Sequence, residues 1–374
     1  MKIVSVMTTG SQGGAEFAAV EMLAALAGRG HESVLLTDQP TMARDRQVRV
    51  APIDIGPKLS VDSYRSLTLR AWPYLRRLRR ALEAEAPYDV LLVHYKKEQL
   101  LSRWLPEHLR RTLVWAEWGP VPFPMRQGPA RRMYLAAAQR ASLVLAISEG
   151  TRRNVCEVGV PERKVHYVPN VMATDEIAFT GDGRARVRRE LSIPDEAFVV
   201  GCISRFHPKK RNDVVVDAVA ALGDGAHLIM AGDGETEADL RARAGPLSER
   251  AHFVPTPGMD VADYLSAFDV SVFCPSPTEG APRAVLLGML ASRPCLSTGA
   301  EGVGDILGPG VGGIAEPEND PDALVALLRE YVDDPERVRR EGEEARRRVE
   351  ATYAAPVVAE HIENLLRQAG AGAP

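Results

Sequence analysis

Short apolar runs with the composition of β-strands alternate with helical stretches along almost the whole chain. Apolar strands separated by helices predict parallel sheets that are covered on both faces. The pattern restarts near residue 198, which predicts two doubly wound α/β domains rather than one large sheet. The expected strands span residues 3–7, 33–37, 48–53, 90–94, 112–115, 143–147 and 165–168 in the first set, and 198–204, 227–231, 252–254, 270–273 and 295–297 in the second.

The domain boundary is expected in residues 169–183, which show little apolar periodicity. We therefore expect a first domain over residues 1–172, a second over 173–351, and a crossover helix within 352–374. The helical tail is longer than the second sheet alone requires, so its end should return to the first domain. Ligands on open parallel sheets bind beyond the carboxyl ends of the strands, which predicts a site in a cleft between two facing domains.

Composition excludes several functional classes. The chain has 374 residues, 45% of them hydrophobic and 26% charged, and a net charge of −4. These values are ordinary for a globular enzyme and give no overall attraction to nucleic acid or to an anionic membrane. The first ten residues lack the long apolar stretch of a signal peptide, and no apolar run approaches the ~20 residues that a membrane span needs. We expect a cytoplasmic protein.

One motif follows the first strand of each domain. Gly13 and Gly14 lie between a strand and a helix, where glycine lets backbone approach a phosphate, although such turns are often glycine-rich for steric reasons. Arg205 and Lys210 follow the strand at residues 198–204, where two cations suit a diphosphate. A solvated basic turn is the alternative for the second motif.

Two further motifs lie at strand ends in the second half. The turn at residues 231–235, with Gly232 and Gly234, is most simply explained as structural. Glu279 lies in a turn rich in Pro and Gly that leads into a helix expected at residues 283–291. Backbone N–H groups at a helix start, together with one carboxylate, suit a ligand with a diphosphate and sugar hydroxyls.

The order and spacing of these motifs resemble the retaining glycosyltransferases of family 4, which have the GT-B fold. The resemblance covers most of the chain, through GGAE, RFHPKK, LIMAGDGE, SPTEGAPRAVLLGML and GVGDILGPGVGGIAEPENDPDALVALL. It implies a hexosyltransferase that uses a nucleotide-sugar donor, UDP- or GDP-linked, held mainly by the second domain. It also implies that the reaction needs no metal or other cofactor, in keeping with the absence of a metal-ligand cluster in the sequence.

The resemblance also implies roles for particular residues. Arg205 and Lys210 would neutralise the diphosphate leaving group, and Glu279 would hold a hydroxyl of the donor sugar. Catalysis would then be mostly electrostatic, because charge builds on the departing phosphate. The remaining donor-binding positions are Gly13, Gly14, Gly280, Ala281, Pro282, Arg283 and Leu287.

This chain departs from the family at two positions. Leu287 stands where the family has a second Glu that binds the donor ribose, and leucine cannot accept hydrogen bonds from hydroxyls. Trp118 stands where the family often has a histidine in the first domain, with Glu117 beside it. His94 ends the preceding strand and is a candidate substitute for that histidine, although a structural role is the simpler interpretation.

The aromatic segment at residues 115–124 is expected to line the acceptor side of the cleft or, equally, to be a packed loop. The acceptor is expected to be a small hydroxylated molecule, such as a natural product or a glycoside, or a glycan. The basic and aromatic stretch at residues 70–80 is better explained as a solvated helix face than as a surface for anionic lipid. The alternatives to a transferase are a sugar-nucleotide epimerase on the same fold and a catalytically silent binding or scaffold protein. The sequence carries no signal for an oligomeric state.

Overall fold

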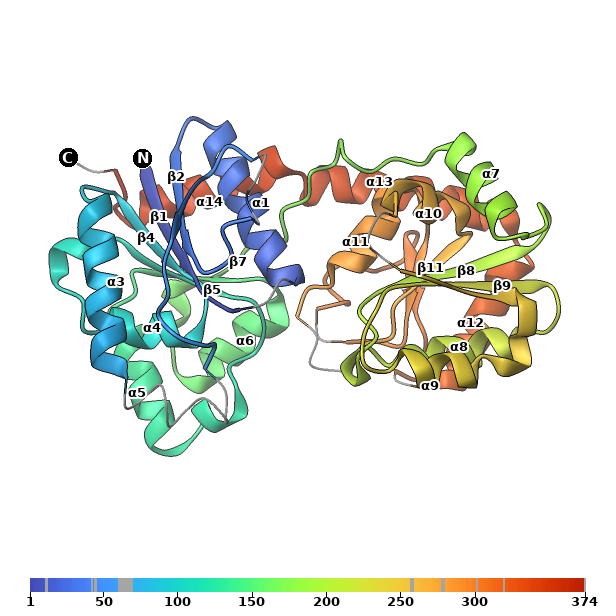
Figure 1. The fold of residues 1–374 in the computed structure, drawn as a ribbon, viewed down its shortest axis with the longest axis horizontal. Helices are drawn as coiled ribbons and strands as arrows, with labels where there is room; N and C mark the ends of the chain where they lie inside the picture. Colours follow the sequence, from blue (N-terminus) through green and yellow to red (C-terminus); the bar gives the residue numbers. More distant parts are fainter. Residues whose placement is uncertain are drawn as a thin grey trace. The chain divides into compact units, whose positions relative to one another are not determined.

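A computed structural model describes residues 1–10, 13–41, 43, 46–59, 70–255, 259–276, 280–300, 302–318 and 320–372. The chain divides into two compact units, coloured mainly blue to green and green to orange in Figure 1. The first unit comprises Met1–Met172 together with Ala355–Pro374, and the second comprises Ala173–Ala354. None of the helices that the structure describes is long and apolar enough to cross a bilayer.

The first unit is built on a seven-stranded parallel sheet in the order β3-β2-β1-β4-β5-β6-β7. Its strands are β1 (Lys2–Met7), β2 (Glu32–Thr37), β3 (Arg49–Pro52), β4 (Val90–Val93), β5 (Leu113–Glu117), β6 (Leu143–Ala146) and β7 (Val165–Tyr167). Its helices are α1 (Gly14–Gly28), α3 (Ala71–Glu85), α4 (Lys96–Ser102), α5 (Gly128–Ala138), α6 (Glu149–Val158) and α14 (Ala355–Gln368), with short 3₁₀ turns at Glu107–Leu109, Phe123–Met125 and Glu162–Lys164.

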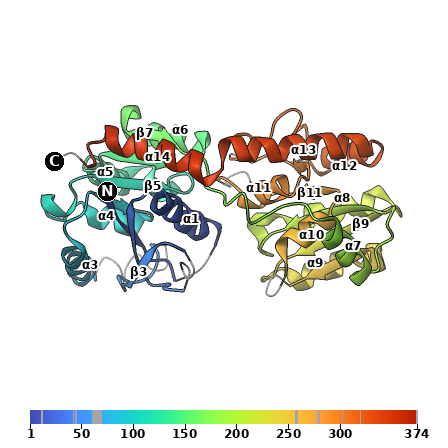
Figure 2. The same cartoon turned by 90° about the horizontal axis from the view of Figure 1, so that it is seen from above.

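Both faces of this sheet are covered, because successive residues of each strand point to opposite sides. In β1, Ile3 packs with α1 and α14, whereas Val4 packs with the helices from α3 to α6. Helix α14 comes from the end of the chain and contacts α1, and the two lie close together in Figures 1 and 2. This contact confirms the prediction that the last helix returns to the first domain.

The second unit is built on a six-stranded parallel sheet in the order β10-β9-β8-β11-β12-β13. Its strands are β8 (Phe198–Ile203), β9 (Ala226–Ala231), β10 (Ala251–Val254), β11 (Val270–Val272), β12 (Cys295–Ser297) and β13 (Gly312–Ile314). Its helices are α7 (Gly181–Glu190), α8 (Asn212–Leu222), α9 (Glu237–Arg243), α10 (Val261–Ala267), α11 (Arg283–Leu290), α12 (Pro321–Val332) and α13 (Pro335–Thr352), with 3₁₀ turns at Pro208–Lys210 and Gly245–Arg250. The two parallel sheets confirm the prediction of two doubly wound α/β domains.

Each sheet reverses its strand order at one place. In the first unit the reversal lies between β1 and β4, and in the second it lies between β8 and β11. Connections leave these neighbouring strands in opposite directions, so the loops after them diverge and leave room at the carboxyl edge of the sheet. The predicted motifs at Gly13, His94, Arg205 and Glu279 follow β1, β4, β8 and β11 in turn.

Candidate functional site

The carboxyl edge of β8 and β11 brings together two of the predicted motifs. The backbone N–H of Ser276, in the loop after β11, donates a hydrogen bond to the carbonyl of Lys209 over 2.8 Å. The ammonium of Lys210 lies 5.2 Å from the centroid of the Phe273 ring, a cation–π contact. Arg205 is exposed and Lys210 is half-buried. Two cationic side chains therefore stand on the loop that directly adjoins the segment leading to α11.

The Gly232–Gly234 turn packs against the backbone of the loop that follows β8. A Cβ on Gly232 would lie 2.0 Å from the carbonyl oxygen of Ser204, and a Cβ on Gly234 would lie 2.2 Å from that of Phe206. Phe206 also donates its backbone N–H to the carbonyl of Asp233 over 2.7 Å. Only glycine permits such close approach between two backbones, so the turn holds the loop that carries Arg205.

The segment before α11 is described only in part, since Pro277, Thr278 and Glu279 lie outside the described residues. Gly280 is buried, and a Cβ on Gly302 would lie 1.0 Å from its carbonyl oxygen. The loop after β12 is thus in backbone contact with the turn that begins α11. Ala281, Pro282 and Arg283 follow this contact at the amino end of the helix, where partial positive charge accumulates.

Leu287 lies one turn further along α11. Its side chain is half-buried and packs against an apolar cluster that includes Phe268 and Ala291. That cluster fills the face of the second sheet covered by α7 and α10. Leu287 therefore has a packing role whatever else it contacts.

In the first unit, the Gly13 motif caps α1. Gly13 has the extended backbone of an N-cap, and Gly14 is the exposed first residue of the helix; Ser11 and Gln12 lie outside the described residues. Glu16, in the first turn, is buried and accepts a hydrogen bond from the hydroxyl of Tyr95. The structure thus places the paired glycines at a helix start beyond the carboxyl end of β1.

His94 is buried at the carboxyl end of β4, with 2% of its surface exposed. Its Nε2 lies 2.7 Å from the hydroxyl of Ser5, and its Nδ1 accepts a hydrogen bond of 3.1 Å from Nε1 of Trp118. Burial lowers the pKa of His94 to about 3. Both ring nitrogens therefore have partners inside the unit.

The side chain of Glu117, a candidate acceptor-binding group, is buried in the first unit. Its side chain is 3% exposed, forms an ion pair with Lys96, and accepts a hydrogen bond of 3.0 Å from the hydroxyl of Tyr134. Burial lowers the pKa of Lys96, an effect that the neighbouring Glu117 carboxylate opposes. Trp115 is fully buried in the same region. Both residues are part of the core, because β5 is covered by helices on both faces.

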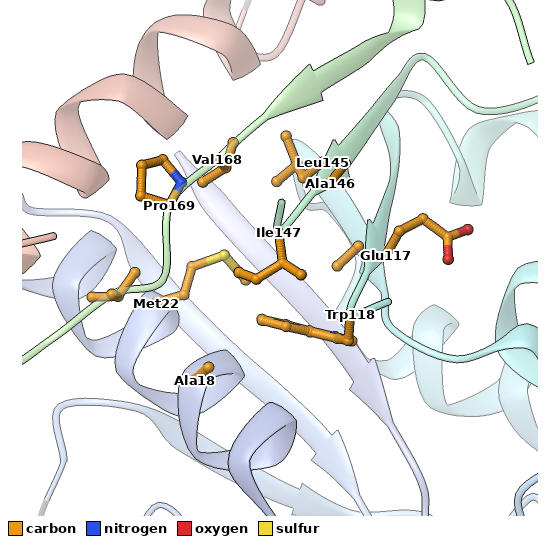
Figure 3. A pocket seen from close by; sticks show the side chains of 11 residues that line it. Ala18, Met22, Glu117, Trp118, Leu145, Ala146, Ile147, Val168 and Pro169 are labelled. Carbon is orange, nitrogen blue, oxygen red and sulfur yellow. The ribbon is translucent and has the colours of Figure 1, made fainter. Parts of the chain in front are cut away.

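Beside Trp118, a small cavity opens between α1 and the carboxyl ends of β5, β6 and β7. Its volume is about 20 Å³, and Ala18, Met22, Trp118 and Ile147 contribute to its lining. Figure 3 shows the Trp118 ring directed toward Ala18 and Met22, whereas the Glu117 carboxylate points away from them. In the aromatic segment at residues 115–124, Trp118 therefore lines this cavity, whereas Phe123 is exposed at the surface.

A buried polar network beside His94 is the feature that the sequence reasoning missed. The carboxylate of Glu98 is fully buried and accepts hydrogen bonds from the backbone and hydroxyl of Thr8. The Lys97 ammonium lies 3.9 Å from this carboxylate and donates to the carbonyls of Gly56 and Pro57. Burial raises the pKa of Glu98. The signal was present, since three consecutive charged residues, Lys96 to Glu98, begin three positions after the end of the apolar strand β4.

Among the described residues, no group of three or more His, Cys, Asp and Glu side chains is arranged to hold an ion. Cys202, Cys274 and Cys295 are buried free thiols, and burial raises the pKa of each. Neutral thiols of this kind are packing residues rather than metal ligands.

Two doubly wound units, one with a cationic loop at its switch point, form an arrangement that suits nucleotide-linked ligands. Comparison with known families makes this specific. Residues 12–176 match the family described as Glycosyltransferase Family 4, and residues 183–348 match the family described as Glycosyl transferases group 1. The chain belongs to this family of glycosyltransferases, whose members transfer a sugar from a nucleotide-sugar donor.

Individual relatives are distant. The chain is 26% identical over 379 residues to the D-inositol 3-phosphate glycosyltransferase of Streptomyces avermitilis, covering 91% of this chain and 80% of the relative. It is 28% identical over 199 residues to a GDP-mannose-dependent monoacylated alpha-(1-6)-phosphatidylinositol monomannoside mannosyltransferase of Corynebacterium glutamicum, covering 50% of this chain and 52% of that relative.

The fold of the chain is also that of a solved structure. Anabaena Alr3699/HepE, crystallised with UDP-glucose, superposes with a TM-score of 0.82 at 20% identity, covering 98% of this chain and 100% of the other. At this identity the likeness shows the fold alone. Together with the family matches, it confirms the GT-B fold that the sequence motifs predicted.

Proposed function

We propose that the protein is a retaining, metal-independent hexosyltransferase that moves a sugar from a UDP- or GDP-linked donor to a small hydroxylated acceptor. The observation that carries the proposal is the adjacency of two loops at the switch point of the second sheet. Arg205 and Lys210 stand on one loop, and the hydrogen bond between Ser276 and Lys209 joins it to the other. Cations at this edge suit a diphosphate.

The proposed chemistry is electrostatic. As the bond between the anomeric carbon and the diphosphate breaks, negative charge grows on the leaving group and the sugar becomes cation-like. Arg205 and Lys210 stabilise the leaving group more strongly in this transition state than in the bound donor. The amino end of α11, from Gly280 to Arg283, adds partial positive charge near the donor. We assign Glu279 to a hydroxyl of the donor sugar, and Gly13 and Gly14 to the phosphates.

Transfer with retention does not require a side-chain base in this proposal. His94 is engaged at both ring nitrogens, and Glu117 is paired with Lys96. The departing diphosphate oxygen, on the same face of the sugar as the acceptor, is then the group that takes up the proton of the acceptor hydroxyl. The donor base is proposed to be uracil or guanine, since the Anabaena structure contains UDP-glucose and the Corynebacterium relative is named for GDP-mannose.

The test is hydrolysis of donors without an acceptor, measured with UDP-, GDP- and dTDP-sugars. Wild type should release free sugar slowly from one donor class, and Glu279→Ala and Lys210→Ala should lose about 10²-fold or more of that rate. Lys209→Ala is the matched control, because it removes a neighbouring charge on the same turn. An isomerised donor sugar would favour an epimerase instead, and no thermal shift with any nucleotide would favour a silent protein.

A further inference from the structure

The residues that line the cavity beside Trp118 indicate what kind of chemical group it could bind. It lies at the carboxyl edge of the first sheet, where α1 approaches the ends of β5, β6 and β7. Ala18 and Met22 come from α1, and Ile147 and Val168 from the strand ends. Apart from Glu117, the lining side chains in the described part of the chain are apolar.

Glu117 does not change this character. Its carboxylate is directed away from the cavity in Figure 3 and is held by Lys96 and Tyr134, and Tyr134 belongs to the apolar cluster on the opposite face of the sheet. A volume of about 20 Å³ admits one group of about the size of a water molecule. Because the lining offers water few hydrogen-bond partners, a methyl or methylene group fits this space better than a hydroxyl does.

Trp118 is held in place above this cavity. Its indole N–H is bonded to Nδ1 of His94, which is itself 2.7 Å from the Ser5 hydroxyl on β1. The two rings are stacked, with 5.7 Å between their centroids and 14° between their planes. The Trp118 side chain is half-buried, so part of it remains accessible. A fixed aromatic surface loses little freedom when a ligand ring packs against it.

We propose that Trp118 is a specificity-determining residue that binds an apolar part of the acceptor, with a methyl-sized group entering the adjoining cavity. The acceptor is then an amphipathic molecule, with its reacting hydroxyl beside an apolar ring or chain, rather than a uniformly hydroxylated glycan. This inference rests on the proposed transferase function. His94 and Ser5 act through Trp118 and are positioning residues.

Binding of two probes tests the inference. The phenyl probe, 4-methylphenyl β-glucoside, and glucose share a sugar and differ in the apolar ring with its methyl group, and calorimetry on the full chain with bound nucleotide measures both. Wild type should bind the phenyl probe about tenfold more tightly than glucose. Trp118→Ala removes the aromatic surface, and Ala18→Leu fills the cavity. Each variant should abolish that preference. Trp104→Ala, at an aromatic residue that is 53% exposed on the same unit, should leave it intact.

Two further measurements keep the result decisive. Trp118→Phe keeps an aromatic face without the indole N–H, and it should retain at least part of the preference. It replaces Trp118→Ala in the test if that variant fails to fold. Donor hydrolysis without acceptor should persist in the control variant Trp104→Ala. Equal binding of the two probes by wild type, or no binding of the phenyl probe, overturns the inference even where donor hydrolysis is present. Absence of donor hydrolysis in wild type instead overturns the proposed function.

Discussion

Trp118 donates a hydrogen bond from its indole nitrogen to Nδ1 of His94 over 3.1 Å. An indole nitrogen can only donate, so Nδ1 must accept, and the proton of the neutral imidazole resides on Nε2, facing the Ser5 hydroxyl. The tautomer of His94 is therefore set by Trp118. Both ring nitrogens of His94 are thus engaged within the first unit.

The first prediction concerns pH. Burial lowers the pKa of His94 to about 3, whereas an unfolded chain has a histidine pKa of about 6.5. The unfolded state then binds a proton that the folded state excludes, so the free energy of unfolding falls as pH drops. Between about pH 7 and about pH 5 this residue should account for a loss of about 2 kcal/mol. Chemical denaturation at both pH values measures it.

His94→Gln is the comparison for that measurement, because glutamine has no group that titrates in this range. The variant should be less stable at neutral pH but should show a correspondingly smaller loss on acidification. His31, His227 and His252, whose pKa values burial also lowers, titrate in both proteins and cancel. The same pH dependence in wild type and variant would contradict the assignment of His94.

The second prediction concerns the ion pair between Lys96 and Glu117. Both side chains are largely buried, at 14% and 3% exposed, so removing one leaves an unpaired buried charge. Lys96→Met should lower the free energy of unfolding by about 3–5 kcal/mol. Arg79→Ala, which removes an exposed ion pair with Glu83, should cost about 0–1 kcal/mol. Similar losses for the two variants would show that the buried pair is not a structural element.

The third prediction concerns the contact between Gly302 and Gly280. A Cβ at position 302 would lie 1.0 Å from the Gly280 carbonyl oxygen, so Gly302→Ala must displace the turn before α11. We expect nucleotide-sugar binding to weaken by about tenfold or more, because donor groups at a site act only when correctly placed. Gly304→Ala is the control, since its Cβ would meet nothing within 4 Å. The affinities of the two variants for the nucleotide sugar, measured by calorimetry, should differ. Equal affinities would show that this turn does not contribute to donor binding.

The fourth prediction concerns Leu287. Because its half-buried side chain packs against the cluster around Phe268, Leu287→Ala should lower the free energy of unfolding by about 1–3 kcal/mol. Leu287→Glu should be more destabilising, since it places a carboxylate against apolar side chains. Thermal unfolding and nucleotide titration on both variants separate packing from ligand contact. A stable Leu287→Glu that binds nucleotide more tightly would instead place this residue beside the ligand.

The fold was largely predictable because apolar strands between helices are a strong local signal. The exceptions have physical causes. No strand was predicted at Gly312–Ile314, because its two glycines carry no side chain that would mark a sheet. Strand β13 forms there because it pairs with β12. Helix α7 was missed because Gly181–Glu190 is mostly polar, and its stability comes from contact with α10.

The site was predictable only where backbone geometry dictates it. The positions of glycine pairs and cations at strand ends can be predicted, since the carboxyl ends of parallel strands lie along one edge of the sheet. The direction in which a side chain points at such a strand end cannot be predicted from the sequence. Glu117 and Trp118 are adjacent in sequence, yet one turns into the core toward Lys96 and the other borders the cavity. That difference depends on partners that lie far away in the sequence.

The central claim is that the edge of β8 and β11 binds the diphosphate of a nucleotide sugar. Calorimetric titration of UDP- and GDP-sugars into wild type, Lys210→Ala and Lys209→Ala tests it most directly. We predict binding of one donor class by wild type, a loss of about tenfold or more in Lys210→Ala, and near-normal affinity in Lys209→Ala. No binding of any donor by wild type, or equal affinity in all three proteins, would contradict it.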